Sequence, residues 1–180
     1  LYQQTKHGTD ISFQKVSEVS NQQAMVVDNL GKVWTGTYNG LLCFQSPERN
    51  TPLKLEASFV SEADKVFSLN KNVIKSLYKD KPGVIWVGTN GGGVNKFDPE
   101  RKNFYHYGNN LSVNGSIYKE VRSIFEDSKG DLWVGTEGGG LFLQKAEGDN
   151  NSYNNFERFA TGGGRVFALE EIIKNDNRYL

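Results

Sequence analysis

Three acidic residues close together in the sequence, Glu126, Asp127 and Asp131, could supply the converging pair of carboxylates that glycoside hydrolases need. Asp127, however, recurs at corresponding positions as Asp28 and Asp80, and each of these three aspartates is followed three residues later by a glycine. A residue that recurs in every copy of a repeat is better explained by the structure of the repeat than by one active site. We therefore interpret the three aspartates as turn residues and assign no catalytic residue to the chain.

Two glycine triplets, at residues 91–93 and 138–140, resemble phosphate-binding loops at first sight. A P-loop, however, requires Lys followed by Ser or Thr after its glycines, and then a helix. Here the triplets are followed by Val-Asn-Lys-Phe at 94–97 and Leu-Phe-Leu at 141–143, which we interpret as strands. The triplets are therefore predicted to form hairpin turns in which glycine supplies dihedral angles that a side chain would block.

The chain contains few of the residues that bind transition metals or form disulfides. It contains one cysteine, Cys43, and two histidines, His7 and His106, which lie far apart in the sequence. One thiol cannot form an internal disulfide, and a structural zinc site needs about four cysteine or histidine ligands. We predict no metal site and no cofactor.

The elements that position these residues form a repeat. The tryptophans at positions 34, 86 and 133 lie 52 and 47 residues apart, and residues 132–140 nearly copy residues 85–93. This period is close to that of one four-stranded propeller blade, about 40 to 50 residues. Each copy holds an apolar run, an Asp-x-x-Gly turn, a tryptophan strand, a glycine turn and another apolar run, and this order predicts short antiparallel strands. Fourth strands are predicted at residues 103–107 and 156–159.

Aspartate and tryptophan anchor each copy of the repeat. The aspartate is expected to cap its turn by accepting backbone N–H bonds. The indole is expected to fill the space between facing sheets, and the glycine of the following Gly-Thr pair to let a neighbouring backbone come close. The predicted structural residues of the repeat are Asp28, Trp34, Asp80, Trp86, Asp127 and Trp133.

These patterns predict an all-β chain that forms part of a β-propeller, with three to four four-stranded antiparallel blades. The predicted division is the end of a preceding blade at 1–20, blades at 21–60, 61–108 and 109–160, and the start of a further blade at 161–180, opened by residues 166–169. Three to four blades do not close a ring that typically needs about 4 to 8. We therefore expect an excerpt of a larger propeller, or a fragment that completes itself with another copy.

Composition disfavours some partners. The 21 basic and 21 acidic side chains give zero net charge, so neither nucleic acid nor an acidic membrane surface is an expected partner of this segment. No apolar run approaches the roughly 20 residues of a membrane-spanning helix.

When the copies of the repeat are aligned, the second residue of the first strand differs in type from copy to copy more than the residues on either side of it. We call this position the variable column. Gln23, Lys75, Arg122 and Phe167 occupy it, and small residues follow each of them. If the first strand of each blade lines the central channel, this column could face the channel and hold a ligand, or it could be a solvated lining without one. Propeller sites are usually assembled at one mouth of the channel from several blades.

The hairpin tips and the residues just before an inner strand could lie at the same mouth. Aromatic and amide side chains there would suit a carbohydrate, because they offer a flat apolar face and hydrogen-bonding groups. The candidate ligand-binding residues are Tyr38, Asn39, Lys75, Asn90, Tyr118, Lys119, Arg122 and Glu137.

Residues 121–141, with their turn, tryptophan and glycine triplet in order, resemble the two-component regulator propeller repeat, and residues 74–94 resemble it almost as closely. The copy at 22–44 departs from the pattern, since Tyr-Asn-Gly replaces the triple glycine, and the copy that begins at Val166 lacks the Asp-x-x-Gly turn. The resemblance implies the periplasmic sensor region of a hybrid two-component histidine kinase of the Bacteroidetes type.

In such proteins two seven-bladed propellers typically precede an immunoglobulin-like domain, a membrane helix and a cytoplasmic kinase. The resemblance thus implies a seven-bladed parent propeller that senses oligosaccharides, signals as a homodimer and meets the membrane only through the parent's transmembrane helix. The family's repeat contains no catalytic residue. Two alternatives stay open: a carbohydrate-active propeller enzyme such as a glycoside hydrolase, and a scaffold propeller without a small ligand.

Overall fold

The computed structural model describes residues 2–7, 10–15, 19–45, 53–107, 112–113, 116–146, 156–159, 164–174 and 177–179. Over these ranges the regular structure consists of strands, and three four-stranded antiparallel sheets follow one another along the chain. The all-β prediction and the prediction of three to four four-stranded blades are confirmed. Within the same ranges, no helix has the length and apolarity that crossing a membrane would require.

Each sheet runs from an inner to an outer strand in sequence order, joined by hairpins. Blade 1 contains β3 (Ala24–Val27), β4 (Val33–Thr37), β5 (Gly40–Gln45) and β6 (Lys54–Phe59). Blade 2 contains β7 (Ile74–Lys79), β8 (Ile85–Thr89), β9 (Gly93–Asp98) and β10 (Asn103–Tyr107). Blade 3 contains β13 (Val121–Glu126), β14 (Leu132–Thr136), β15 (Leu141–Gln144) and β16 (Glu157–Phe159).

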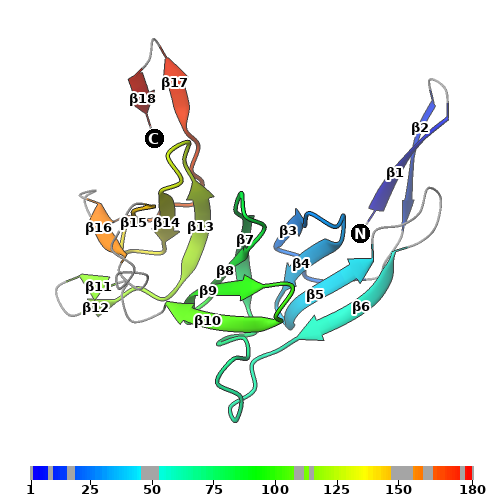
Figure 1. The fold of residues 1–180 in the computed structure, drawn as a ribbon, viewed down its shortest axis with the longest axis horizontal. Coiled ribbons are helices and arrows are strands. Elements are labelled where there is room, and N and C mark those ends of the chain that lie inside the picture. The colour runs from blue at the N-terminus through cyan, green and yellow to red at the C-terminus, as the bar shows by residue number, and fades with distance from the viewer. Residues whose placement is uncertain are drawn as a thin grey trace.

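The blades stand side by side in an open fan (Figure 1). The strands β3, β7 and β13 lie on its inner side, and β7 contacts both β3 and β13. The strands β6, β10 and β16 lie on the outer side. Because the inner strands meet at the centre, their residues are the ones that a channel ligand would reach.

Three two-stranded hairpins accompany the blades. They are β1 (Tyr2–His7) with β2 (Asp10–Lys15), β11 (Ser112–Val113) with β12 (Ser116–Ile117), and β17 (Ile172–Lys174) with β18 (Asn177–Tyr179). The first and last hairpins project from the two ends of the fan (Figure 1). Residues 166–169, which the sequence assigned to the first strand of a further blade, are not in a strand; among the described residues no second strand is available to pair with them.

Neighbouring blades share their cores. Trp34 and Leu41 of blade 1 form one buried cluster with Ile74, Phe97 and other apolar residues of blade 2. The Trp34 and Phe97 rings lie 5.0 Å apart, edge to face. A second cluster likewise joins Trp86 of blade 2 to apolar residues of blade 3. Burying one large apolar side chain contributes about 1.5 to 3 kcal/mol, so these shared clusters stabilise the packing of each blade on the next.

A glycine in the second strand of each blade receives a side chain from the next inner strand. A Cβ on Gly88 would lie 2.6 Å from Cγ1 of Val121, and Gly36 meets Ile74 in the same way. Gly135 meets Val166, so the segment after Gly164 docks on blade 3 as β13 docks on blade 2. The nearest atoms to Gly36 and Gly88 are thus branched side chains of the next inner strand, and the strands themselves also approach, since β4 contacts β7 and β8 contacts β13.

The repeated aspartates accept three hydrogen bonds each. In blade 1, Oδ1 of Asp28 accepts the N–H groups of Leu30 and Lys32, at 2.9 and 2.8 Å, and Gly31 in the same turn has a φ of 78°. Oδ2 of Asp28 accepts the indole N–H of Trp34 at 2.9 Å. Blades 2 and 3 repeat this arrangement with the pairs Asp80 and Trp86, and Asp127 and Trp133. One carboxylate thus fixes both the turn and the anchoring indole.

Candidate ligand-binding surface

The glycine hairpins and the residues that lead into the inner strands lie at the same end of the blades. The N–H of Asn90 donates to the carbonyl of Val73, and the N–H of Gly91 to that of Lys119. Gly93 also donates to the carbonyl of Lys119, and blade 3 repeats this bond, because Gly140 donates to Gly164. We call this the hairpin end, formed by residues 36–40, 70–75, 89–93, 118–122, 136–140 and 164–167. The opposite, turn end carries the Asp-x-x-Gly turns.

The variable column of the repeat is a β-bulge in blades 2 and 3. Pairing between β7 and β8 shifts register between Ile74 and Ser76, so Lys75 is the extra residue. Pairing between β13 and β14 shifts between Val121 and Ser123, so Arg122 is the extra residue. A bulge changes the direction of the side chain it carries and is frequent beside functional sites. The structure therefore singles out the same column as the sequence, through an independent feature.

Lys75 and Tyr38 come together across the junction of blades 1 and 2. The Lys75 ammonium lies over the Tyr38 ring, 5.1 Å from its centroid. The Tyr38 side chain remains 42% exposed, and Asn39 next to it is exposed as well. These residues, with the exposed Asn90 of the next hairpin, offer an aromatic ring, two amides and a cation to solvent.

Arg122 lies in a network of charges at the junction of blade 3 and the following segment. Its Nη2 is 2.6 Å from Oε1 of Glu120, and its Nε donates to Oε2 of Glu137 at 3.0 Å. Arg165 pairs with the same Glu137, and the Arg122 guanidinium lies 5.7 Å from the Phe167 ring centroid. Two carboxylates already pair with the Arg122 guanidinium, so its charge is balanced within the protein without a ligand.

Two of the predicted residues, Tyr118 and Lys119, also have structural roles. The half-buried Tyr118 packs against the core cluster between blades 2 and 3, and a Cβ on Gly139 would lie 2.5 Å from its ring. Lys119 uses its carbonyl to hold the hairpin through the N–H groups of Gly91 and Gly93. Sequence reasoning missed Glu120 and Arg165. The Glu-x-Arg spacing of Glu120 and Arg122 was a usable signal for the first, but nothing in the sequence brings Arg165 to Glu137.

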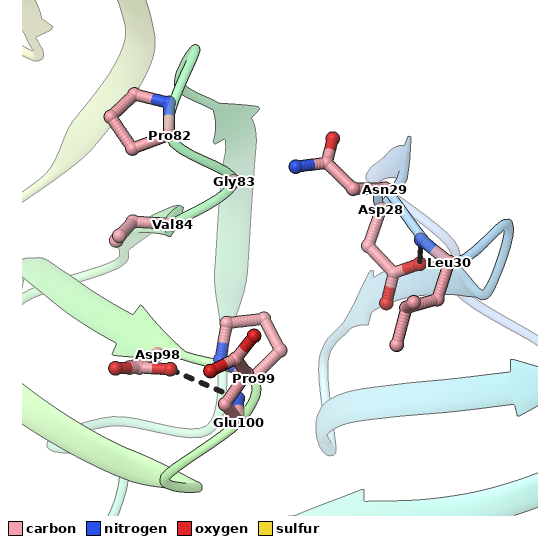
Figure 2. A pocket seen from close by; sticks show the side chains of 9 residues that line it. All are labelled: Asp28, Asn29, Leu30, Pro82, Gly83, Val84, Asp98, Pro99 and Glu100. Atoms are coloured by element: carbon pink, nitrogen blue, oxygen red, sulfur yellow. Dashed lines mark hydrogen bonds between the residues drawn. The ribbon is translucent and has the colours of Figure 1, made fainter.

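A pocket of about 200 Å³ lies at the turn end, between blades 1 and 2. Figure 2 shows Asn29 on one side of it and Gly83 on the other. Two of the three carboxylates that line it already accept hydrogen bonds: Asp28 from its own turn, and Asp98 from the N–H of Glu100 at 2.9 Å. A groove of about 500 Å³ lies at the outer edge, beside Phe59, Phe67 and Phe104. Neither contains any predicted ligand-binding residue.

Possible metal ligands do not gather on this surface. Across the described ranges, no three His, Cys, Asp or Glu side chains are arranged to hold a metal ion. The chemistry available at the hairpin end is therefore stacking, hydrogen bonding and charge pairing.

Comparison with known proteins agrees with this architecture. Residues 68–91 and 110–138 match the family described as "Two component regulator propeller". None of the curated proteins compared with the chain matches it.

The chain resembles solved extracellular domains from B. thetaiotaomicron. A structure from BT4673, described as a hybrid two component system, is 26% identical with a TM-score of 0.63, over 86% of this chain and 21% of that chain. A second BT4673 structure, described as a one component system, is 24% identical with a TM-score of 0.62, over 92% and 24%. The domain of BT3049, described as a hybrid two component system, is 19% identical with a TM-score of 0.63, over 82% and 20%.

The chain thus spans about a fifth to a quarter of the length of these domains. Each matched segment contains the tryptophan strand of its blade, β8 or β14, and ends at the first glycine of the triplet that follows. Two segments of the chain, one in blade 2 and one leading into blade 3, therefore match repeats of the two component regulator propeller family.

Proposed function

We propose that this chain is a segment of the extracytoplasmic sensor propeller of a hybrid two-component protein, and that its hairpin end binds an oligosaccharide. Two findings support the sensor role: the match of two segments to the family, and the 26% identity to an extracellular domain described as part of a hybrid two component system. The proposed location is the periplasm, with the parent protein held in the membrane by a transmembrane helix.

The observation that carries the ligand proposal is the placement of Lys75 over Tyr38. Two blades contribute to this contact, and a bulge directs the lysine. A sugar ring presents C–H groups that stack on an aromatic face, while its hydroxyls suit amide groups such as those of Asn39 and Asn90. Because two blades contribute residues to this site, a bound ligand would also influence how these two blades are arranged relative to each other.

Signalling requires a further property. A ligand shifts an equilibrium only when it binds one state better than the other. We propose that the parent protein is a homodimer with two signalling states, and that the occupied hairpin end favours one of them. The segment itself has no catalytic role in this proposal.

The proposal is tested by incubating the 180-residue chain with a panel of plant and host oligosaccharides. Thermal unfolding reports binding, and chromatography of the mixture reports cleavage. A ligand at a concentration one hundred times its Kd stabilises the folded state by about 2.7 kcal/mol, which is readily detected. A saturable stabilisation without cleavage is expected.

A matched pair of variants locates the site. Tyr38→Ala should abolish the stabilisation, whereas Tyr105→Ala, on outer strand β10 and equally exposed at 41% against 42%, should leave it unchanged. Release of shorter sugars would support the enzyme alternative instead. Absence of any binding, with the chain folded, would favour a scaffold.

A further inference from the structure

We propose that the ligand of the hairpin end carries an anionic group, a uronate carboxylate or a sulfate, and that this group pairs with Lys75. The inference rests on the proposed function, since it names the class of oligosaccharide. Three observations carry it: the charge of the surface, the pairing of its cations and the position of Lys75.

The hairpin end is basic although the chain as a whole is neutral. Its segments contain five cationic side chains and two carboxylates, whereas the whole sequence contains 21 of each sign. The cations are Lys71, Lys75, Lys119, Arg122 and Arg165, and the carboxylates are Glu120 and Glu137. Charge of one sign gathered on one surface attracts ligands of the opposite sign.

The two carboxylates are already used by the two arginines. Glu120 pairs with Arg122, and Glu137 pairs with both Arg122 and Arg165. The three lysines form no ion pair with any residue in the described ranges. The free positive charge of this surface therefore belongs to its lysines, not to its arginines.

Among these lysines, Lys75 is the one that the fold positions. The bulge in β7 directs its side chain, and the Tyr38 ring holds its ammonium at 5.1 Å, where the negative face of the ring attracts a cation. Lys75 and Lys119 are half-buried, whereas Lys71 is exposed, and of the two half-buried lysines only Lys75 lies at a bulge and over an aromatic ring. A half-buried cation without a carboxylate partner gains a strong, charge-assisted hydrogen bond when an anion binds.

Arg122 supplies an internal comparison. It occupies the same bulge position in the next blade, but two carboxylates neutralise it. The same structural position thus presents a free cation in blade 2 and a balanced one in blade 3. We infer that Lys75 selects the charge of the ligand, while Arg122 holds the surface of the neighbouring blade in place.

The test measures Kd by calorimetry on the complete 180-residue chain at about 50 and 300 mM salt. The probes are an oligogalacturonate, a sulfated glycosaminoglycan oligosaccharide and a neutral xylo-oligosaccharide of similar length. At least one acidic probe should bind at least tenfold more tightly than the neutral one, and its binding should weaken with salt, because exposed charges are screened. Which acidic probe binds distinguishes a carboxylate from a sulfate.

Variants separate a defined contact from diffuse attraction. Lys75→Gln should weaken acidic binding about tenfold or more, the range expected for a lost hydrogen bond to a charged group. Lys75→Arg should retain most of it. Lys81→Gln, which removes an exposed lysine at the turn end, is the control and should change Kd less than twofold. Circular dichroism of each variant verifies the fold.

The outcomes distinguish this inference from the function on which it rests. Equal binding of neutral and acidic probes, or tighter binding of the neutral one, would overturn the inference and leave the oligosaccharide sensor in place. Equal losses from Lys75→Gln and Lys81→Gln would also overturn it, since the attraction would then be diffuse. If no glycan binds, both the anionic-ligand inference and the proposed oligosaccharide sensor are overturned.

Discussion

The indole N–H of Trp133 donates a 3.0 Å hydrogen bond to Oδ2 of Asp127, which lies six residues earlier in the chain. Asp127 also caps the turn that precedes the tryptophan strand. Oδ1 of the same carboxylate accepts the N–H groups of Lys129 and Asp131. Asp127 is only 8% exposed, so removing the carboxylate would take the acceptor from three donors in a largely buried turn. The spacing of aspartate and tryptophan in the repeat therefore reflects one connected hydrogen-bond set.

We expect Asp127→Ala to destabilise the chain by about 3 kcal/mol, because each buried donor left without a partner costs about 1 to 3 kcal/mol and part of this set can relax toward solvent. Urea unfolding followed by tryptophan fluorescence measures the change. Asp64→Ala is the control, since Asp64 is exposed and lies outside the repeated turns. Equal stabilities of the two variants would mean that the carboxylate does not hold the turn.

Trp133→Ala should cost about 3 to 5 kcal/mol, because the side chain is 7% exposed and packs on Leu141, Leu143 and Val166. Its ring also meets Phe159 edge to face at 5.0 Å. Trp133→Phe keeps much of the packing and loses the N–H, so it should cost clearly less than the alanine variant. A loss near zero for Trp133→Ala would place the indole outside the core.

Gly135→Ala should destabilise by about 1 to 3 kcal/mol through overpacking. A Cβ there would lie 2.3 Å from Ser123 Oγ, and 2.7 and 2.8 Å from Cγ1 and Cβ of Val166. The serine can rotate away, but the branched valine cannot, so the segment at Val166 must shift. In a Val166→Ala background the cost should be smaller by at least about 0.5 kcal/mol. Strictly additive losses would show that the two residues do not touch.

The structure of a single blade could be predicted from the sequence because its main features depend on contacts between residues close together in the chain. Each turn, tryptophan strand and glycine hairpin uses residues close together in the chain, so the repeated pattern could be interpreted copy by copy. Contacts between blades were not predictable in this way. Glu126 at the end of β13 accepts the N–H of Lys81 in the preceding blade at 3.2 Å, and Glu171 accepts that of Ser128 at 2.9 Å. Only the packed fan shows that these two glutamates occupy equivalent positions.

The candidate surface was partly predictable for the same reason. The variable column could be found by aligning copies, and it contains Lys75 and Arg122. Periodicity did not show that both residues are bulges, because a register shift depends on the partner strand. Arg122 pairs with Glu120 before blade 3 and with Glu137 within it, and Glu137 also pairs with Arg165 after it, so no local pattern revealed the whole network. Whether these side chains bind a ligand stays a prediction.

Thr35→Val should stabilise the chain by about 1 kcal/mol. Thr35 is fully buried, and its hydroxyl has no hydrogen-bond partner in the described structure. Blades 2 and 3 have Val87 and Val134 at the corresponding position, both fully buried. An apolar side chain of the same shape removes the cost of the unpaired hydroxyl. Val134→Thr is the reciprocal control and should destabilise, as measured by urea unfolding; a stabilising Val134→Thr would contradict the explanation.

Cys43 should make stability depend on pH in the alkaline range. Its side chain is 2% exposed, and burial, aided by the nearby Glu56 carboxylate, raises the pKa of the thiol from its ordinary value of 9.0 to about 11. Below pH 9.0 the thiol is protonated in both states and has no effect on the unfolding equilibrium. Between the two pKa values the unfolded chain has lost this proton while the folded chain keeps it, so stability falls as pH rises.

Cys43→Ala removes this contribution, so its stability should fall less steeply than that of the unchanged chain between pH 9 and 11. Burial also raises the pKa values of Tyr78 and Tyr107, but both proteins contain these tyrosines and their effect cancels in the comparison. Urea unfolding at pH 8, 9, 10 and 11 measures both slopes, with a reductant present to keep the thiol free. Parallel curves would show that the thiol ionises equally easily in both states and is therefore accessible to water in the folded chain.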